Sequence, residues 1–233
     1  MKYNSRAIAL TYLKHSETSI IAKIYTEIRG LQTFIVKGVR SKNSKNKLGL
    51  FQPLKLSIIS GTINKKRTFQ YLNEIFLAKD VPVSILNMKN QLLSLFIAEV
   101  MSKILHENEE DERLFQYIWD LKISLIRNEN INNNLALNFL LELSKFLGFY
   151  PSLENLQSKY FDLDQGEFTN EINNFCVSEK NSIYLKLLLT KNTCDIPKKN
   201  RIELLNTIIN YYKMHNHELK NITSHSIINE FKT

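Results

Sequence analysis

The sequence is poor in cysteine, glycine and proline, and it has no long apolar run. Its 233 residues include two cysteines, six glycines and four prolines, and 43% of them are hydrophobic. That composition is typical of an ordinary globular protein, because a disordered chain would show low hydrophobicity and long biased tracts. No apolar run approaches the roughly eighteen residues that a membrane helix needs, and the first residues are typical of a strand, not of a signal peptide. We therefore expect a globular, cytoplasmic protein with no membrane partner.

Neither the cysteines nor any short motif marks a catalytic centre. Cys176 and Cys194 are separated by seventeen residues, which fits neither a CxxC redox pair nor a structural zinc site of four thiolates. The common phosphate-binding, nucleophile and zinc-protease motifs (GxxxxGKS/T, GxGxxG, GxSxG and HExxH) do not occur. The sequence therefore predicts no cofactor, no metal and no enzymatic activity.

One enzymatic alternative remains open, a metal-dependent nuclease. His215 and His217 are close in the sequence, and Asp162 and Asp164 share one face of a predicted hairpin strand. A bound metal needs three or four ligands that converge on one point, and the sequence indicates no place where these would meet. This alternative predicts DNA cleavage that a chelator abolishes.

Acidic residues are nearly missing from the first third of the chain. Residues 1–79 hold fifteen Lys and Arg but only three acids, Glu17, Glu27 and Glu74, which gives a net charge of +12. The rest of the chain has sixteen cations and twenty acids, a net charge of −4. A lysine-rich composition alone would not remove the acids from one end. A segment this basic favours a polyanion as its partner.

The basic segment has the pattern of five short strands. Strands are expected where β-forming residues run together, at Ala7–Leu13, Ser19–Thr26, Gln32–Val36, 51–60 and 69–78. Gly30, Gly38 and a turn formed by Gly61 and residues 64–67 separate these runs. Five strands in about eighty residues are typical of the OB-fold, a small Greek-key barrel. We predict an OB-fold nucleic-acid-binding domain over residues 1–79.

The period of the apolar residues changes to that of helices after this segment. One helix is expected from Pro82 to about residue 105, and a second helix follows the polar break at 106–113. Further helices are expected at 132–148, 182–190, 201–212 and 224–231. A small hairpin is expected near 158–170, around Gln165 and Gly166. The prediction is an α+β chain, with a mainly helical domain over residues 80–233 that contains the hairpin.

The candidate binding site is a pair of basic loops on the barrel. The stretch KGVRSKNSKNK carries Lys37, Arg40, Lys42, Lys45 and Lys47, and a second loop carries Lys65, Lys66 and Arg67. Flexible cations of this kind neutralise phosphates and release counterions. Bases could stack on aromatic residues of the strands, although most of these are expected in the core. The candidates are Tyr12, Tyr25, Phe34, Phe51, Phe69 and Tyr71.

The order of these features resembles one bacterial family, the RecO recombination-mediator proteins. The segment RAIALTYLKHSETSIIAKIYTEIRGLQTFIVKGVRSKNSKNKLGLFQPLKLSII is similar to the family's amino-terminal part, with its Arg-Ala-Ile strand, Thr-Glu-x-x-Gly turn, Lys-Gly-x-Arg loop and Gln-Pro step. NFLLELSKFLGFYPSLENL resembles the family's central helix and its Leu-Gly-x-x-Pro exit. The similarity extends over most of the chain.

The resemblance implies a DNA-binding protein without enzymatic turnover. Such proteins bind single- and double-stranded DNA and anneal complementary strands. With RecR they help to load RecA onto strands coated by single-stranded-DNA-binding protein, whose acidic tail is a further expected partner. Many members carry a four-cysteine zinc site after the Leu-Gly-x-x-Pro exit, and this chain lacks those thiolates. We therefore predict a metal-free hairpin held by Tyr160, Phe161 and Phe168.

A second, non-enzymatic alternative is a protein-interaction adaptor. In that case the basic barrel would dock an acidic partner protein instead of DNA, and the function would lie in the protein contacts of the helical domain. Binding of the barrel to an oligonucleotide and to an acidic peptide would separate the two hypotheses.

Overall fold

The computed structural model describes residues 2–41, 44, 47–62, 64, 69–79, 81–82, 87–129, 131–191, 194–217, 219, 222 and 224. Its internal contacts divide the chain into two compact units, Met1–Asn130 and Ile131–Thr233. Among these residues, the first unit holds five strands, a short 3-10 helix and two α-helices, and the second holds three α-helices and a hairpin. The division between a barrel domain and a helical domain after residue 79 remains a prediction.

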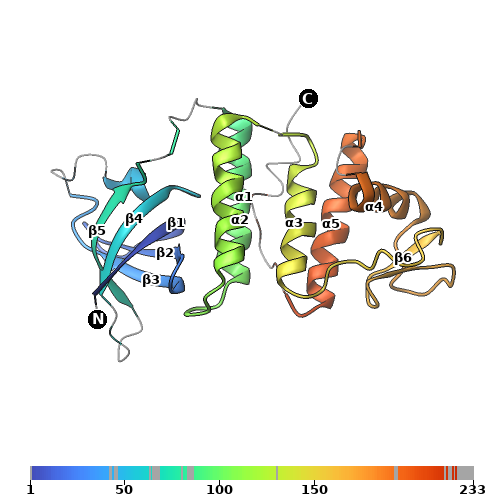
Figure 1. Cartoon of the computed structure of the whole chain (residues 1–233), viewed down its shortest axis with the longest axis horizontal. Helices are drawn as coiled ribbons and strands as arrows, with labels where there is room; N and C mark the ends of the chain where they lie inside the picture. The colour runs from blue at the N-terminus through green and yellow to red at the C-terminus, as the bar shows by residue number, and fades with distance from the viewer. Residues whose placement is uncertain are drawn as a thin grey trace. The chain divides into compact units, whose positions relative to one another are not determined.

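The strands of the first unit form a closed barrel, as the sequence predicts. They are β1 (Lys2–Lys14), β2 (Ile20–Thr26), β3 (Gly30–Val36), β4 (Leu56–Thr62) and β5 (Gln70–Leu77). Their order around the barrel is β1-β2-β3-β5-β4, and β1 pairs with β4 to close it (Figure 1). All pairs are antiparallel except β3 with β5. This is an OB-type barrel.

The barrel interior is built from alternating apolar residues. Ile20, Ala22 and Ile24 of β2 point inward at every second position, as the two-residue period of a strand requires. The 3-10 helix η1 (Lys47–Phe51), between β3 and β4, places Phe51 in the same core. Gly61 was predicted in the turn after β4, but it belongs to β4 itself, where an added Cβ would lie 2.8 Å from the Tyr3 ring.

Two helices complete the first unit. Helix α1 (Met88–Ile104) and helix α2 (Glu112–Arg127) lie side by side next to the barrel (Figure 1). The prediction of a start at Pro82 is wrong for α1, because Asn87 is its N-cap and accepts a hydrogen bond from the Lys89 amide. The acidic start predicted for α2 is confirmed: the Asp111 carboxylate accepts the Leu114 amide at 2.9 Å.

The second unit contains α3 (Leu135–Phe146), the hairpin strands β6 (Tyr160–Asp162) and β7 (Glu167–Thr169), α4 (Glu179–Lys191) and α5 (Lys198–Met214). Its core includes Phe161 and Phe168, which are each 1% exposed and whose ring centroids are 5.0 Å apart. The predicted packing of these two rings is confirmed, whereas Tyr160 is only half-buried. The predicted last helix lies almost wholly outside the described residues. Within the described part of the chain, no helix is long and apolar enough to cross a membrane.

Candidate nucleic-acid interface

The loop that joins β3 to β4 carries the described part of the predicted site. Lys37, Arg40 and Lys47 are all exposed there, and none of the ion pairs among the described residues involves them. The other predicted contacts lie outside the described residues. They are Lys42, Lys45, Lys65, Lys66 and Arg67.

The described part of this loop is anchored on the barrel. Val39 is 3% exposed and belongs to the barrel core. The Ser41 hydroxyl donates to the Gly38 carbonyl at 2.9 Å, and the Ser44 hydroxyl donates to the Val39 carbonyl at 2.7 Å. A buried anchor between Lys37 and Arg40 fixes where the two cations leave the barrel surface. The sequence pattern showed the charges of this loop but not its anchor.

Arg40 connects two loops of the barrel. One guanidinium nitrogen donates to the carbonyls of Ser16 at 3.0 Å and Glu17 at 3.3 Å, in the turn between β1 and β2. Its backbone amide also donates to the Thr18 carbonyl at 3.1 Å. Arg40 therefore has a structural role that the sequence did not indicate, although its guanidinium, with five N–H donors, keeps others for a phosphate.

A groove opens beside the basic loop, along the seam between β3 and β5. Among the described residues, these strands pair at Phe34 with Gln70 and at Ile35 with Tyr71. The groove has a volume of about 380 Å³, and the lining includes Lys37, Lys47, Tyr71 and Phe76. Lys37 Nζ lies 5.7 Å from the centre of the Tyr71 ring, a cation–π distance. The groove thus combines two cations with aromatic surface.

The predicted base-stacking residues separate into two sets. Tyr25 and Phe34 are fully buried and Phe51 is 1% exposed, so these three belong to the core. Tyr12, Phe69 and Tyr71 are 37–38% exposed, and of the six candidates only Tyr71 is among the residues that line the groove. The sequence missed Phe76, which is 59% exposed on the outside of β5. Strand alternation did not identify Phe76, because Asn73 is an extra residue in β5, opposite Ser60 and Gly61 of β4, and it shifts the alternation of the residues after it.

The outer face of β2 and β3 is covered by the helical part of the same unit. The Lys23 ammonium donates to the Ser102 carbonyl at 3.2 Å, and the Tyr25 hydroxyl donates to the Asp111 carbonyl at 2.9 Å. Thr33 bonds to the Glu107 carboxylate. Burial also raises the pKa of Tyr25. OB-folds commonly bind oligonucleotides across this face, and here it is occupied.

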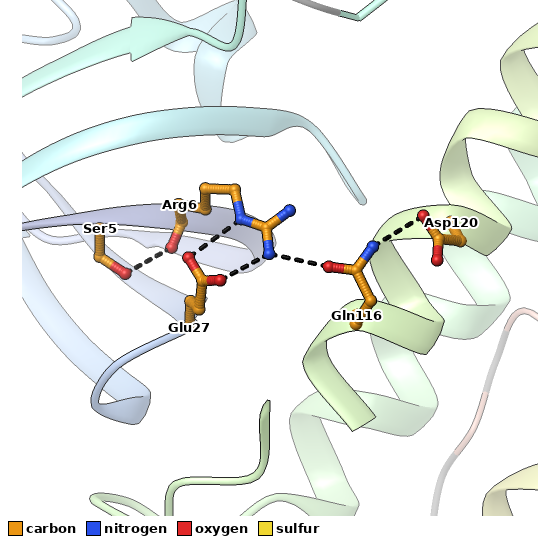
Figure 2. Close-up of polar contacts among 5 residues, drawn as sticks. All are labelled: Ser5, Arg6, Glu27, Gln116 and Asp120. Atoms are coloured by element: carbon orange, nitrogen blue, oxygen red, sulfur yellow. Dashed lines mark hydrogen bonds and ion pairs between the residues drawn. The ribbon is translucent and has the colours of Figure 1, made fainter. Parts of the chain in front are cut away.

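Arg6 makes a further contact between the barrel and α2 (Figure 2). Its guanidinium donates to both carboxylate oxygens of Glu27, at 3.0 and 2.5 Å, and to the Gln116 side chain at 2.8 Å. The hydrogen bond to Glu27 raises the pKa of Arg6. The same guanidinium lies 5.0 Å from the Trp119 ring centre. Arg6 therefore contributes to the positive charge of the barrel segment, but its guanidinium is bound to groups of the protein itself.

The residues of the nuclease alternative have other partners. The rings of His215 and His217 each stack on Phe149, with centroids 5.1 Å apart. The Asp162 carboxylate accepts the amides of Asp164 and Gln165. Among the described residues, no group of three or more His, Cys, Asp or Glu side chains could hold a metal ion.

The fold and its exposed cations define a class of protein: an OB-type barrel with a basic loop, followed by helices. The chain belongs to the Recombination protein O family, whose N-terminal model matches residues 1–80 and whose C-terminal model matches residues 87–220. It is 29% identical over 237 residues to the DNA repair protein RecO of Flavobacterium psychrophilum, with 99% of each chain covered. It is 28% identical to that of Flavobacterium johnsoniae, again over 99% of each chain. The RecO of Bacteroides fragilis is 31% identical over 70% of this chain and 68% of its own.

Proposed function

We propose that this protein is a non-enzymatic DNA-binding protein of recombinational repair, which anneals complementary strands. The observation that carries the proposal is the charge of +12 on residues 1–79, with Lys37 and Lys47 exposed on one loop and outside any ion pair among the described residues. Membership of the Recombination protein O family supports the same process.

The mechanism is electrostatic. Two DNA strands repel each other through their phosphates, and lysines held along one surface neutralise part of that charge when a strand binds. The remaining repulsion against a complementary strand is smaller, so the strands approach closely enough to pair. Base pairing then supplies the sequence specificity, and the protein itself needs none. No bond in the DNA is made or broken.

Salt dependence of binding tests the electrostatic step. If about four lysines contact phosphates of single-stranded DNA, the logarithm of affinity falls against the logarithm of salt concentration with a slope near −3. Fluorescence anisotropy with a labelled oligonucleotide measures this slope. A slope close to zero would contradict the proposal, because it would mean that no counterions are released.

Charge reversal locates the surface. Changing Lys37, Lys42, Lys45 and Lys47 to Glu should abolish binding at moderate salt and stop strand annealing, whatever the sequence. Arg40 is left in place because it holds the turn between β1 and β2. A single Lys37→Glu change is compared with Lys180→Glu, which makes the same charge change at an exposed position of α4 in the second unit. Equal effects of a single Lys37→Glu change and of Lys180→Glu would indicate a diffuse charge effect without a site.

The partners follow from the family resemblance. We infer that the protein acts with RecR on strands coated by single-stranded-DNA-binding protein, whose acidic tail it contacts, and that it thereby helps to load RecA. The measurement is the rate of RecA filament formation on coated single strands, with and without each protein. The adaptor alternative, in which the basic barrel docks an acidic protein, instead predicts that an acidic peptide binds and an oligonucleotide of equal charge does not.

A further inference from the structure

The groove between β3 and β5 has the composition of a site for one unpaired base. Its lining residues include the aromatic Tyr71 and Phe76, the aliphatic Ile35, and the basic Lys37 and Lys47. Both rings are exposed, Tyr71 at 38% and Phe76 at 59%. Exposed aromatic rings next to cations are the arrangement that proteins use to hold single-stranded nucleic acid.

A base fits the groove better than a phosphate does. Glu74 and Asn73 are also among the lining residues, and an acidic residue at the groove disfavours a phosphate there. A base edge carries amino and imino donors that a carboxylate accepts. The cations, which belong to the loop and to η1, then remain for the phosphates on either side. The negative charge of Glu74 likewise disfavours the acidic tail of a protein in this groove.

The volume agrees with a single occupant. About 380 Å³ is near the lower end of the range for small-molecule sites, which begins at roughly 300 Å³. A stacked duplex cannot enter such a space, because its bases present only their edges in the grooves of the helix. One base turned out of a single strand can enter it.

The usual path of a strand over an OB barrel is closed in this unit. The outer face of β2 and β3 is covered through Lys23, Tyr25 and Thr33, which contact residues 102–111. Leu31 on the same face is 1% exposed. The groove along β5, lined by Tyr71 and Phe76, offers a strand bound to the basic loop another path.

We propose that this groove is a subsite for one unpaired nucleobase, which stacks on Tyr71 while Lys37 and Lys47 bind the adjacent phosphates. The inference rests on the proposed function, since it assumes that the basic loop binds DNA. It adds a preference for unpaired over paired strands. A protein that holds one base out of the stack keeps a strand open for pairing elsewhere along its length.

The experiment distinguishes binding through a base from binding through the phosphates. A labelled oligothymidylate of about 12 nucleotides, within the usual site size of such barrels, is compared with an abasic strand of equal length and charge. The proteins are the full-length wild type, Tyr71→Leu, Tyr71→Phe and Tyr12→Leu. Leu keeps an apolar residue in the strand, Phe keeps the ring, and Tyr12 is equally exposed but does not line the groove.

The wild type should bind the oligothymidylate about tenfold more tightly than the abasic strand, the effect of one stacked base. Tyr71→Leu should lose this ratio and bind the abasic strand normally, with an unchanged salt slope. Tyr71→Phe and Tyr12→Leu should keep the ratio. Thermal unfolding confirms that all variants fold.

Two other outcomes have different meanings. If Tyr71→Leu keeps the full ratio, or weakens both strands equally with the salt slope intact, the base subsite is wrong and the electrostatic proposal stands. Displacement of the oligothymidylate by an acidic peptide from the wild type, but not from Tyr71→Leu, would also overturn the subsite in favour of a peptide groove. If neither strand shows a salt slope, the proposed function itself fails.

Discussion

Arg6 and Glu27 form a two-point ion pair at the boundary between the barrel and helix α2. The guanidinium donates two hydrogen bonds to the carboxylate and a third, at 2.8 Å, to Gln116 of α2 (Figure 2). The pair is partly buried, with the Arg6 side chain 33% exposed and that of Glu27 21% exposed. Two family-like motifs of the sequence, Arg-Ala-Ile and Thr-Glu-x-x-Gly, therefore position the helices against the barrel.

Removing either partner should destabilise the first unit. Arg6→Gln or Glu27→Gln breaks a charge-assisted pair and leaves the other charge partly buried, which costs about 1–2 kcal/mol. The double variant should lose less than the sum of the two, because the two residues act on each other. Thermal and urea unfolding measure this. The exposed pair of Glu142 and Lys145 on α3 is the control, and Lys145→Gln should cost less than about 0.5 kcal/mol.

Gly30 in the same Thr-Glu-x-x-Gly turn should not tolerate a side chain. Its φ is +59°, and an added Cβ would lie 1.8 Å from the Glu109 carbonyl oxygen. Gly30→Ala should therefore cost about 3 kcal/mol or more, from left-handed strain and from the displacement of the segment before α2. Thermal unfolding gives the loss of stability, and limited proteolysis shows whether the segment around Glu109 is released.

Two other glycines distinguish the effect of left-handed backbone strain from that of the contact with Glu109. Gly38 has φ +71° but open space around its Cβ position, so Gly38→Ala should cost only the strain, about 1 kcal/mol. Gly49 has neither a positive φ nor a neighbour within 4 Å, and Gly49→Ala should be nearly neutral. If the three substitutions were equally harmful, the contact with Glu109 would not be the reason for Gly30.

The sequence predicted the barrel well because its evidence is local. Each strand buries alternate residues, so the pattern of Ile20, Ala22 and Ile24 shows both the strand and its inner face. The roles of Arg6 and Gly30 depend on Gln116 and Glu109, which lie more than seventy residues away in the sequence. No periodicity of the sequence indicates such a long-range contact. The sequence therefore predicted that Arg6 and Gly30 belong to the barrel, but not which residues they contact.

The sequence indicates part of the candidate site, because the charge of a loop is also a local property. Charge density identified the loop of Lys37 and Lys47, and this is a property of composition. The groove depends on how briefly β3 and β5 pair, and the exposure of Phe76 depends on an extra residue, Asn73, in β5 opposite Ser60 and Gly61 of β4. Arg40 has the same charge as its neighbours, yet it donates to the carbonyls of Ser16 and Glu17. Such distinctions need three-dimensional contacts.

Lys122 of α2 should make stability depend on alkaline pH. Burial, with a smaller contribution from nearby Lys55, lowers its pKa from 10.5 to about 8, and its ammonium donates to the Ser94 hydroxyl at 2.9 Å. Below pH 8 the folded protein holds this charge at a cost. Between pH 8 and 10.5 the unfolded chain binds the proton more strongly, so the free energy of unfolding rises with pH.

Lys122→Met removes that dependence. The variant should be more stable than the wild type by about 1–3 kcal/mol at pH 7, and the difference should shrink from pH 8 to about pH 10.5. Thermal unfolding at a series of pH values measures it. Lys180→Met, at an exposed position of α4, should show no such trend. A Lys122→Met variant less stable than the wild type at pH 7 would show that the bond to Ser94 outweighs the cost of burial.

Asp162 holds the turn of the β6–β7 hairpin, where many family members are expected to carry zinc. It is 4% exposed and accepts the amides of Asp164 at 2.8 Å and Gln165 at 3.0 Å, together with the Asn173 side chain. Burial alone would raise the pKa of this carboxyl, but the three hydrogen bonds outweigh it and lower the pKa below 3.8. The charged form therefore stabilises the hairpin.

Asp162→Asn should cost about 1–3 kcal/mol at pH 7, because a charged acceptor of several hydrogen bonds is replaced by a neutral one. The stabilisation by Asp162 is present above pH 4 and is lost as the pH falls through the lowered pKa. Wild type and variant should therefore converge in acid. Asp164→Asn is the matched control, since Asp164 is exposed in the same turn, and it should stay within about 0.5 kcal/mol of the wild type. A constant difference between wild type and Asp162→Asn down to pH 2 would show that packing, not charge, makes Asp162 necessary.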